Sequence, residues 1–300
     1  MAFADVFALP VVAPFRLDLT VAVLRRFSTN LVDVVTPDGG YYRALEGLTA
    51  PNLVRVRQPV PHELEVAVDA PAGEAERAFA LARRMLGAER DVSRFARRAA
   101  RVGWLRTLAQ RMHGVKPPRY PTLWEACVNA IVFQQVSLLA ASAILRRVIQ
   151  SLGSPVEADG AQFYAFPTIA TFLVSEESPL RAAGLSAGKV ATLRRVGEAL
   201  AEGKLDEAML EERSSPEASE LLCAIKGIGP WTAAVILLRG LGRLDVFPAN
   251  DSGAARGLTA LAGEDVDLPA TLATLGDQRG MLYYHLLLAR LEARGELAQS

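Results

Sequence analysis

A short glycine-containing turn between two apolar helical patterns constrains the fold of this chain more than any other stretch. Residues 221–251 read LLCAIKGIGPWTAAVILLRGLGRLDVFPAND, with the turn at Lys226–Pro230. Two glycines spaced by one residue permit backbone angles that are closed to other residues. Pro230 suits the first position of a helix, where its missing N–H costs nothing. One helical face then carries apolar side chains at Trp231, Ala234, Val235 and Leu238.

The turn offers a group of free backbone N–H donors. The helix that starts at Pro230 leaves its first N–H groups without partners, and with those of Gly227–Gly229 they form a site for an anion such as a phosphate. The pattern resembles a helix–hairpin–helix, a motif that grips a DNA backbone without reading bases. An ordinary corner between two helices is the alternative, and the turn by itself leaves both open.

Overall charge gives no signature of a nucleic-acid partner. The chain has 33 basic and 33 acidic residues, a net charge of zero and 51% hydrophobic residues, the composition of a globular protein. The charge is unevenly distributed, because ten arginines fall between Arg77 and Arg111, against only Glu89 and Asp91. This local excess could attract phosphate. The solvated faces of two helices explain it equally well.

Neither the cysteines nor the hydropathy suggest a metal centre, a disulfide or a membrane span. The two cysteines, Cys127 and Cys223, lie within apolar helical patterns and are interpreted as small buried hydrophobes. Their spacing suits neither zinc nor an iron–sulfur cluster. The N-terminal residues lack the basic region of a secretory signal, and no apolar run approaches about 18–20 residues. We expect a cytosolic (cytoplasmic) protein that does not interact with membranes.

The first part of the chain, residues 1–88, predicts a small α+β domain. Apolar and polar residues alternate between Phe15 and Val23, which is the period of a half-buried strand. Pro37–Gly40 is a strong turn signal. An antiparallel sheet is expected to continue with strands at 31–35, 41–45, 53–57 and 64–68. A helix is expected at 73–86.

From about Asp91 onward no stretch alternates, and the periodicity favours helices. Helices are expected at 91–110, from Thr122, at 137–149, 167–174, 178–183 and 186–200, from Ser215, at 252–261 and at 280–293. Ser137 is a good N-cap, so the helix that buries Trp124 should end before it. We expect a mainly helical core of two subdomains, formed by residues 119–243 and by residues 89–118 together with 244–300.

Asp251 ends the opening stretch and lies just over twenty residues after the turn. Ser252-Gly253 and a helical pattern follow it, so its carboxylate could cap the N-terminus of that helix. On this pattern alone, capping is the simpler interpretation.

Three motifs follow one another between residues 122 and 253. They are Trp124-Glu125 with AIVFQQVS at 130–137, GIGPWTA at 227–233, and Asp245-Val246-Phe247 with Asp251. Together they resemble the helix–hairpin–helix DNA glycosylase superfamily, and within it the bacterial 3-methyladenine DNA glycosylase II family. The N-terminal sheet is also similar to that family's N-terminal β domain. The resemblance implies an α+β fold in which an N-terminal antiparallel sheet with a helix packs on a helical glycosylase core.

The resemblance implies roles for the carboxylate and for the hairpin. Asp251 matches the family's catalytic aspartate, which opposes the positive charge that develops on the sugar as the bond from C1′ to the base breaks, and could help to orient or activate water. An alkylated purine is already cationic and leaves without a general acid, so no cofactor is expected for catalysis. DNA contacts are expected from Lys226, Gly227, Ile228, Gly229 and Thr232. A monovalent cation, Na⁺ or K⁺, is expected on the backbone carbonyls of Cys223, Ile225 and Gly227.

Trp231 occupies a telling position, two residues after the second glycine. Bifunctional members of the superfamily have a lysine there, which attacks C1′ and leads to strand cleavage. Tryptophan cannot be that nucleophile, so the resemblance implies a monofunctional enzyme. The indole also suits a pocket wall for a cationic base, by stacking and cation–π attraction. Packing beneath the hairpin is the alternative.

The family's wedge and base pocket are only partly matched. The wedge residue, often leucine in related enzymes, is Gln135 here, next to a further DNA-contacting residue, Gln134, so the wedge is polar or lies elsewhere. Val235 and Leu287 stand where characterised relatives have aromatic side chains, and Phe133 is expected to line the same pocket. Tyr283, Tyr284 and His285, in the last expected helix, are interpreted as core or pocket-lining residues. These departures put the range of lesions in doubt, but not the type of reaction.

The leading hypothesis is a monofunctional DNA glycosylase that acts as a monomer on damaged double-stranded DNA. It would excise alkylated bases of the 3-methyladenine and 7-methylguanine type and leave an abasic site. A second hypothesis is a non-catalytic protein that binds damaged DNA, against which the presence of Asp251 speaks. A third is a bifunctional glycosylase/lyase for oxidised bases, which Trp231 disfavours.

Overall fold

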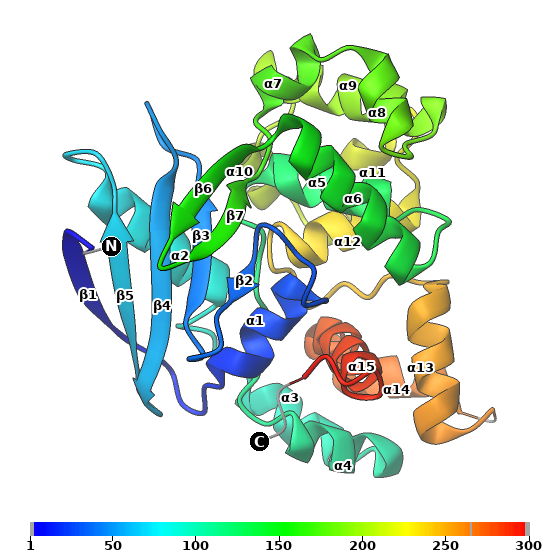
Figure 1. Ribbon diagram of the computed structural model, residues 1–300. Coiled ribbons are helices and arrows are strands. Elements are labelled where there is room, and N and C mark those ends of the chain that lie inside the picture. The colour runs from blue at the N-terminus through cyan, green and yellow to red at the C-terminus, as the bar shows by residue number, and fades with distance from the viewer. Residues whose placement is uncertain (1–2, 265, 298–300) are drawn as a thin grey trace.

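An antiparallel sheet lies on one side of the molecule and helices make up most of the rest (Figure 1). The computed structural model describes residues 3–264 and 266–297. The five strands are ordered β1-β5-β4-β3-β2 across the sheet. Their bounds are β1 Asp5–Pro10, β2 Val34–Val35, β3 Tyr41–Leu45, β4 Asn52–Val60 and β5 Glu63–Asp69. No helix among the described residues combines the length and the apolar character that crossing a bilayer requires.

Helices follow one another through most of the chain beyond the sheet. The first of them are α1 Leu17–Arg25, α2 Ala75–Leu86, α3 Ser93–Ala99, α4 Gly103–Arg111, α5 Leu123–Val132 and α6 Leu138–Leu152. The middle group consists of α7 Ile169–Val174, α8 Glu177–Ala182, α9 Ala187–Ala201, α10 Glu207–Glu211, α11 Ser215–Cys223 and α12 Pro230–Arg239. The last are α13 Ser252–Ala262, α14 Leu268–Leu275, the 3-10 helix η1 Gly276–Gln278 and α15 Gly280–Glu292. The predicted α+β fold, with an N-terminal antiparallel sheet on a helical core, is confirmed.

The strand predicted from Phe15 to Val23 is wrong, because this stretch forms the helix α1. The apparent alternation arises from two helical stripes that bury different faces. One stripe contacts the core under the sheet and consists of Leu17, Val21 and Leu24. The other contacts the helical core and consists of Leu19, Ala22 and Val23. Asp18 is the one exposed residue of the helix, so hydropathy shows no polar face from which a 3.6-residue period could be recognised.

The other strands of the sheet are predicted with mixed success. Those at 41–45, 53–57 and 64–68 are confirmed as β3 and as parts of β4 and β5, and the helix at 73–86 is confirmed as α2. The strand expected at 31–35 is reduced to the two residues of β2. The edge strand β1, which pairs antiparallel with β5, is not predicted. Leu9 is its one buried residue, so its hydropathy carries little signal.

A hairpin lies within the part of the chain that was expected to be wholly helical. Strands β6 (Ser154–Ala158) and β7 (Ala161–Ala165) meet at Asp159-Gly160, where φ is 49° and 76°. Two positive φ angles are typical of a type I′ hairpin turn. The expectation that nothing alternates beyond Asp91 is therefore wrong, and the Asp-Gly pair between short apolar runs is the signal that would have found this hairpin.

The hairpin packs against the larger sheet (Figure 1). Phe163 is fully buried, and its ring lies 6.2 Å from that of Tyr42 on β3, centroid to centroid. The Tyr42 hydroxyl donates a hydrogen bond to the Asp159 carboxylate at 2.7 Å. The segment between α6 and α7 thus anchors the helical part of the chain to the N-terminal sheet.

Three large apolar cores can be compared with the predicted division of the chain. One is formed by residues between 123 and 241, and one lies under the sheet between residues 9 and 88. The third combines residues 19–27, 92–115 and 238–291. Helix α1 contributes to two of these cores, so residues 1–88 are not packed as an isolated unit. The proposed division at residues 88, 118 and 243 stays a prediction.

A buried ion cluster joins the sheet to helix α5. Arg43 on β3 is 1% exposed, and its guanidinium donates to the carboxylates of Asp33 and Glu125, each at 2.5 Å. The Tyr41 hydroxyl also donates to Asp33, at 2.7 Å. Burial by itself lowers the pKa of Arg43, but the two carboxylates hold that pKa well above its ordinary value. Removing one partner of such a cluster leaves buried charge without compensation.

Replacing Arg43 by alanine should therefore lower the free energy of unfolding by about 3–5 kcal/mol, because Asp33 and Glu125 would remain buried without a cation. Urea denaturation followed by circular dichroism measures this change. The matched control is Arg57→Ala, which removes an exposed ion pair with Asp38 and should cost less than about 1 kcal/mol. Similar small losses in both variants would show that the Arg43 cluster does not stabilise the junction.

Candidate active site

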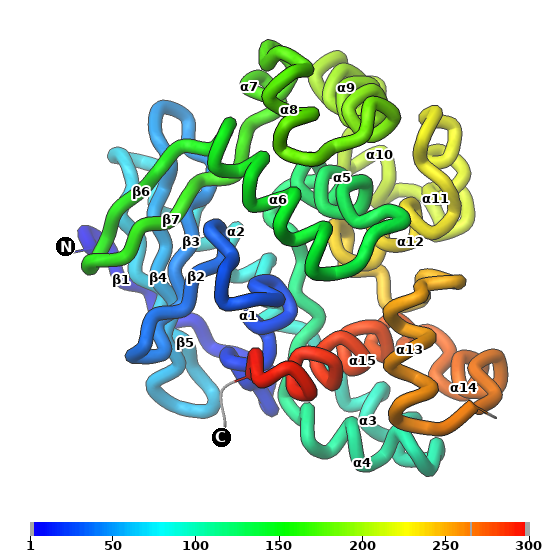
Figure 2. Tube along the Cα trace, turned by 45° about the vertical axis from the view of Figure 1, so that its right-hand side comes forward, coloured from blue at the N-terminus to red at the C-terminus, as the bar shows by residue number. Residues whose placement is uncertain are grey.

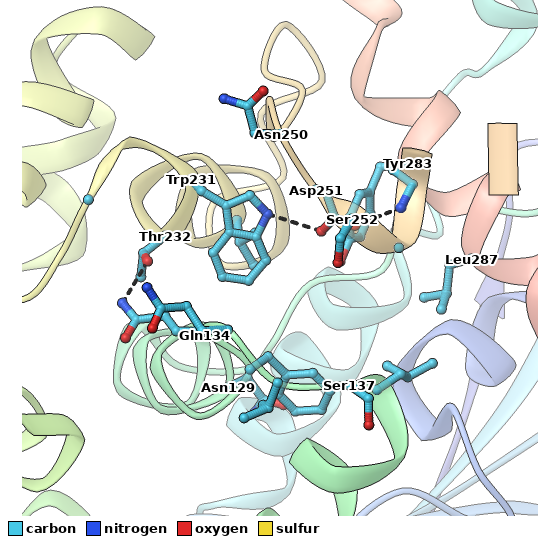
Figure 3. Close-up of a pocket in the computed structure, with 18 of the residues that line it drawn as sticks. Asn129, Gln134, Ser137, Trp231, Thr232, Asn250, Asp251, Ser252, Tyr283 and Leu287 are labelled. Atoms are coloured by element: carbon cyan, nitrogen blue, oxygen red, sulfur yellow. Dashed lines mark hydrogen bonds between the residues drawn. The ribbon is translucent and has the colours of Figure 1, made fainter. Parts of the chain in front are cut away.

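A cleft of about 940 Å³ lies between the α11–α12 hairpin, the junction of α5 and α6, the start of α13 and one side of α15. Figure 3 shows how side chains from these elements converge on it. Most of the residues that the sequence singles out line this cleft: Phe133, Gln134, Gln135, Gly227, Gly229, Trp231, Thr232, Val235, Asp251 and Leu287. Other lining residues are not predicted, among them Arg26, Asn129, Lys189, Arg256 and Arg290. Tyr283, which the sequence suggests as a core or pocket-lining residue, also lines the cleft.

Asp251 has both of its carboxylate oxygens engaged. As the N-cap of α13 it accepts a hydrogen bond from the Ala254 N–H on Oδ1, at 2.7 Å. Its Oδ2 accepts a hydrogen bond from the indole N–H of Trp231 at 3.0 Å (Figure 3). The capping interpretation is thus confirmed, and it does not compete with a catalytic one, because the same half-buried carboxylate lines the cleft.

An arginine and a tyrosine from α15 surround this carboxylate. A Cβ added at Gly253 would lie 2.1 Å from Nη1 of Arg290 and 2.9 Å from Oδ1 of Asp251, so the glycine leaves room for both groups. Burial lowers the pKa of Arg290. Burial, and after it the negative charge of Asp251, raises the pKa of Tyr283, so its phenol stays protonated at neutral pH. Neither residue belongs to a motif, and only the packing of α15 places them beside the carboxylate.

The two hairpin glycines serve different purposes. Gly227 has φ of +103°, and a Cβ there would lie 2.0 Å from the hydroxyl of Thr192 on α9. Gly229 is the N-cap of α12 with φ of −102°, and a Cβ there would meet nothing within 4 Å. Gly227 is therefore required by packing, whereas Gly229 keeps the start of α12 open to an approaching molecule. Ile228, between the two glycines, is buried, and Lys226, which precedes Gly227, is exposed.

The hairpin is tied to the end of α5 by side-chain hydrogen bonds. The amide nitrogen of Gln134 donates to the Gly227 carbonyl at 2.9 Å and to the Thr232 hydroxyl at 2.8 Å. Lys189 on α9 donates its ammonium to the carbonyls of Val132 and Gln134, at 2.8 and 2.9 Å. Gln134 and the buried Thr232, which are predicted to contact DNA, have their side chains engaged with each other. Their predicted DNA contacts stay predictions.

The loop from Gln135 to Ser137 is exposed at the rim of the cleft. Gln135 has φ of +55°, an uncommon angle for a residue with a side chain, and its side chain is exposed. Val136 beside it is 38% exposed and Leu139 is 55% exposed. Ser137 caps α6 by accepting a hydrogen bond from the Ala140 N–H, as predicted. Gln135 is thus a polar candidate for the wedge, and the exposed apolar residues Val136 and Leu139 follow it closely in the chain.

The walls of the cleft are formed by the half-buried indole of Trp231 and by smaller apolar groups. Val235 and Leu287 are buried, at 4% and 6% exposure, and present aliphatic surface where the relatives were expected to have aromatic rings. Phe133 lies half-buried at the end of α5, and the guanidinium of Arg26 stacks over its ring at 4.0 Å. His285 does not line the cleft. It is 2% exposed, its Nδ1 bonds to the Met281 carbonyl at 2.8 Å, and burial lowers its pKa to about 4.

The basic segment from Arg77 to Arg111 contributes no residue to the lining of the cleft. Five of its ten arginines form ion pairs with carboxylates: Arg83, Arg84, Arg94, Arg98 and Arg111. Both views place α3 and α4 at the far end of the molecule from the α11–α12 hairpin (Figures 1 and 2). This arrangement favours solvated helix faces over phosphate binding as the explanation of the segment.

Comparison with known proteins gives the family. No family model matches the chain. A probable bifunctional transcriptional activator/DNA repair enzyme AlkA of Mycobacterium tuberculosis is 31% identical over 265 residues, which cover 87% of this chain and 51% of that protein. The structure of 3-methyladenine DNA-glycosylase from Archaeoglobus fulgidus matches with a TM-score of 0.81 at 26% identity, over 95% of this chain and 99% of that one. The chain belongs to the helix–hairpin–helix DNA glycosylase superfamily.

This membership confirms the predicted family. An 8-oxoguanine glycosylase/lyase of Clostridium acetobutylicum, in complex with DNA, also matches, with a TM-score of 0.73 at 16% identity over 98% of this chain and 100% of that one. At that identity the likeness shows the fold alone. The chain spans about half the length of the curated relatives it matches. The activity of this glycosylase-superfamily chain therefore has to be argued from its own site.

The packing of the hairpin predicts that Gly227→Ala destabilises the protein by about 1–3 kcal/mol, because an unfavourable φ and a steric conflict with Thr192 add together. Thermal or urea unfolding measures the change. Gly229→Ala is the matched control and should stay within about 0.5 kcal/mol of the unsubstituted protein, since its Cβ points into open space. Adding Thr192→Ala to Gly227→Ala should recover part of the loss. Equal effects of the two glycine variants would contradict this assignment.

Proposed function

We propose that this protein is a monofunctional DNA glycosylase, which hydrolyses the N-glycosidic bond of alkylated bases in duplex DNA. The hydrogen bond between the Trp231 indole and the Asp251 carboxylate carries the proposal. It fixes a carboxylate at the edge of a base-sized cleft, and it fills with an indole the position where bifunctional relatives would have a lysine. The substrates proposed are alkylated purines of the 3-methyladenine and 7-methylguanine type.

Asp251 acts on the sugar in this mechanism. As the bond between C1′ and the base nitrogen breaks, the bonding electrons leave with the base and positive charge develops on the sugar. A carboxylate held on both oxygens by Ala254 and Trp231 faces that charge without having to reorient. Water then adds to C1′, and the carboxylate accepts its proton. An alkylated purine that carries a positive charge departs as a neutral molecule, so this step requires no acid.

The hairpin grips the DNA backbone in this proposal. The N–H groups of Gly227 and Gly229 and the start of α12 would receive a phosphate beside the lesion, with Lys226 exposed nearby to add a positive charge. The Ile228 N–H is engaged within the turn, where it donates to the Ile225 carbonyl at 3.0 Å. The open space beside Gly229 suits a close approach of the backbone. The rim residue Gln135, or its apolar neighbour Val136, would fill the gap that the flipped base leaves in the stack.

The cleft then holds the flipped base against Trp231, Phe133, Val235 and Leu287. All of these residues, together with Asp251 and the hairpin, come from one chain, so we propose that the protein acts as a monomer. No cofactor takes part in the proposed reaction.

A monovalent cation on the hairpin carbonyls stays part of the proposal. The Ile225 carbonyl accepts a hydrogen bond from the Ile228 N–H at 3.0 Å, and the Gly227 carbonyl accepts one from Gln134 at 2.9 Å. A carbonyl oxygen has two lone pairs, so these bonds leave one direction on each oxygen for Na⁺ or K⁺. With the carbonyl of Cys223, the cation would stiffen the turn.

Asp251→Asn should lower the single-turnover rate of excision by about 10²–10³-fold, because the amide cannot oppose the charge on the sugar. Release of 7-methylguanine from a duplex that contains one lesion measures this. Asparagine can keep the hydrogen bond from Ala254 that caps the helix, but its amide nitrogen cannot accept the one from Trp231. We therefore expect a small fall in the thermal midpoint, which does not affect the excision assay at a temperature well below that midpoint, and little change in the binding of damaged DNA. Full activity in this variant would show that Asp251 is not the catalytic group. Loss of folding would be seen in the thermal midpoint.

A bifunctional reaction would need an amine at C1′, and Lys189 is the one lysine that lines the cleft among the described residues. Burial lowers its pKa, but its ammonium is held by two backbone carbonyls of the α5 terminus. We therefore expect no covalent complex when the protein is treated with borohydride on 8-oxoguanine or ethenoadenine duplexes. A trapped complex that disappears in Lys189→Gln would establish the lyase alternative.

A further inference from the structure

Arg26 brings a positive charge into the cleft from the N-terminal part of the chain. It is the C-cap of α1, where its N–H bonds to the Ala22 carbonyl and its φ is +60°. Left-handed angles are costly for residues with a side chain and persist where the surroundings enforce them. The side chain is 6% exposed and lines the cleft. The backbone of α1 thus directs an arginine toward the place where a flipped base would lie.

The hydrogen bonds of this arginine go to neutral groups. One guanidinium nitrogen donates to the Tyr120 hydroxyl at 3.0 Å, and the other lies 3.5 Å from Oδ1 of Asn129. Asp33, a carboxylate whose charge influences the pKa of Arg26, is held by Arg43 and Tyr41 instead. Burial lowers the pKa of Arg26, but a guanidinium stays protonated at neutral pH. The charge of Arg26 is therefore buried without a bonded counter-charge.

Arg26 also occupies one face of the Phe133 ring, an aromatic wall of the cleft to which a cationic base could otherwise bind. Its guanidinium carbon lies 4.0 Å from the centroid of the Phe133 ring, so the negative π face on that side is already occupied by a cation. A second cation on the other face would be repelled by the first across the ring. Val235 and Leu287 are aliphatic and offer no cation–π attraction. The other aromatic groups of the lining are Tyr283 and Trp231, and the indole N–H of Trp231 is bound to Asp251.

The charged residues that line the cleft also disfavour a cationic base. Among the described lining residues there are four permanent cations, Arg26, Lys189, Arg256 and Arg290, against the single carboxylate of Asp251. A base that enters with a positive charge meets this excess. A neutral base does not, and it gains from the excess as it leaves, because negative charge builds up on the departing purine.

On the basis of the proposed glycosylase function, we propose that Arg26 makes neutral purine adducts that carry a hydrogen-bond acceptor, such as 1,N6-ethenoadenine, the preferred substrates over cationic bases. The C1′–N9 bond breaks and its electrons pass to the purine. An N–H of Arg26 donates to an acceptor atom of the base and stabilises that charge. Water adds to C1′ and loses a proton to Asp251, and solvent protonates the released base. Arg26 is thus a catalytic residue for neutral leaving groups.

The test compares two lesions in the same duplex sequence, neutral 1,N6-ethenoadenine and cationic 7-methylguanine. Single-turnover excision rates are divided by the spontaneous loss of each base, because cationic purines leave faster by themselves. The full chain should accelerate loss of the neutral base more. Arg26→Gln should lower excision of ethenoadenine at least tenfold and leave excision of 7-methylguanine equal or faster. The ratio of the two rates is insensitive to the fraction of folded protein.

Arg256→Gln is the matched control. It removes one charge from the exposed rim of the same cleft and, lacking a contact with Phe133, should change the ratio of the two rates much less than Arg26→Gln does. A ratio in Arg26→Gln equal to that of the control overturns the proposal. So does a full chain that excises 7-methylguanine but not ethenoadenine, although the glycosylase function then stands. Excision of neither lesion would instead overturn the proposed function itself.

Discussion

The carboxylate of Asp251 accepts one hydrogen bond from the first turn of α13 and another from the indole of Trp231 at the first turn of α12, and the geometry of the cleft depends on this pair. The two helix starts belong to different cores, one built around α5 and α12 and one around α15. The acid that would face the sugar is thus positioned by both walls of the cleft at once. The same contacts that hold the helices in place leave the carboxylate few other orientations, which is the preorganisation that charge stabilisation requires.

The opposite side of the cleft is also fixed by hydrogen bonds, which polar side chains donate to backbone carbonyls. Gln134 joins the end of α5 to the hairpin, and Lys189 holds the two carbonyls on either side of that point. Between these anchors, Gln135 keeps a left-handed backbone and an exposed side chain. A wedge residue has to enter the base stack without displacing its own loop. An exposed side chain on a rigidly held backbone meets this requirement.

Local signals predicted the parts of the molecule that local chemistry determines. The glycine turn, the Ser137 cap and the carboxylate at Asp251 were all recognisable, because turn and cap preferences act within a few residues. The strand prediction for helix α1 is wrong because the helix packs against apolar neighbours on both sides, and burial on two faces removes its helical period. The roles of Arg26 and Arg290 cannot be predicted from the sequence for the same kind of reason. Their contacts with Phe133 and with the surroundings of Asp251 come from tertiary packing, which no spacing in the sequence encodes.

The arginine proposed to contact the base and the residues proposed to bind phosphate come from separate stretches of the chain. Arg26 follows α1 in the sheet-bearing part, whereas the hairpin glycines and Lys226 lie in the helical part, and the Arg43 cluster and the β6–β7 hairpin hold the two together. Substitutions near the end of α1 can therefore alter which base is accepted while the phosphate grip stays as it is. Lesion range and DNA affinity are then separately adjustable traits, and a lineage could acquire a new substrate through changes confined to the N-terminal part.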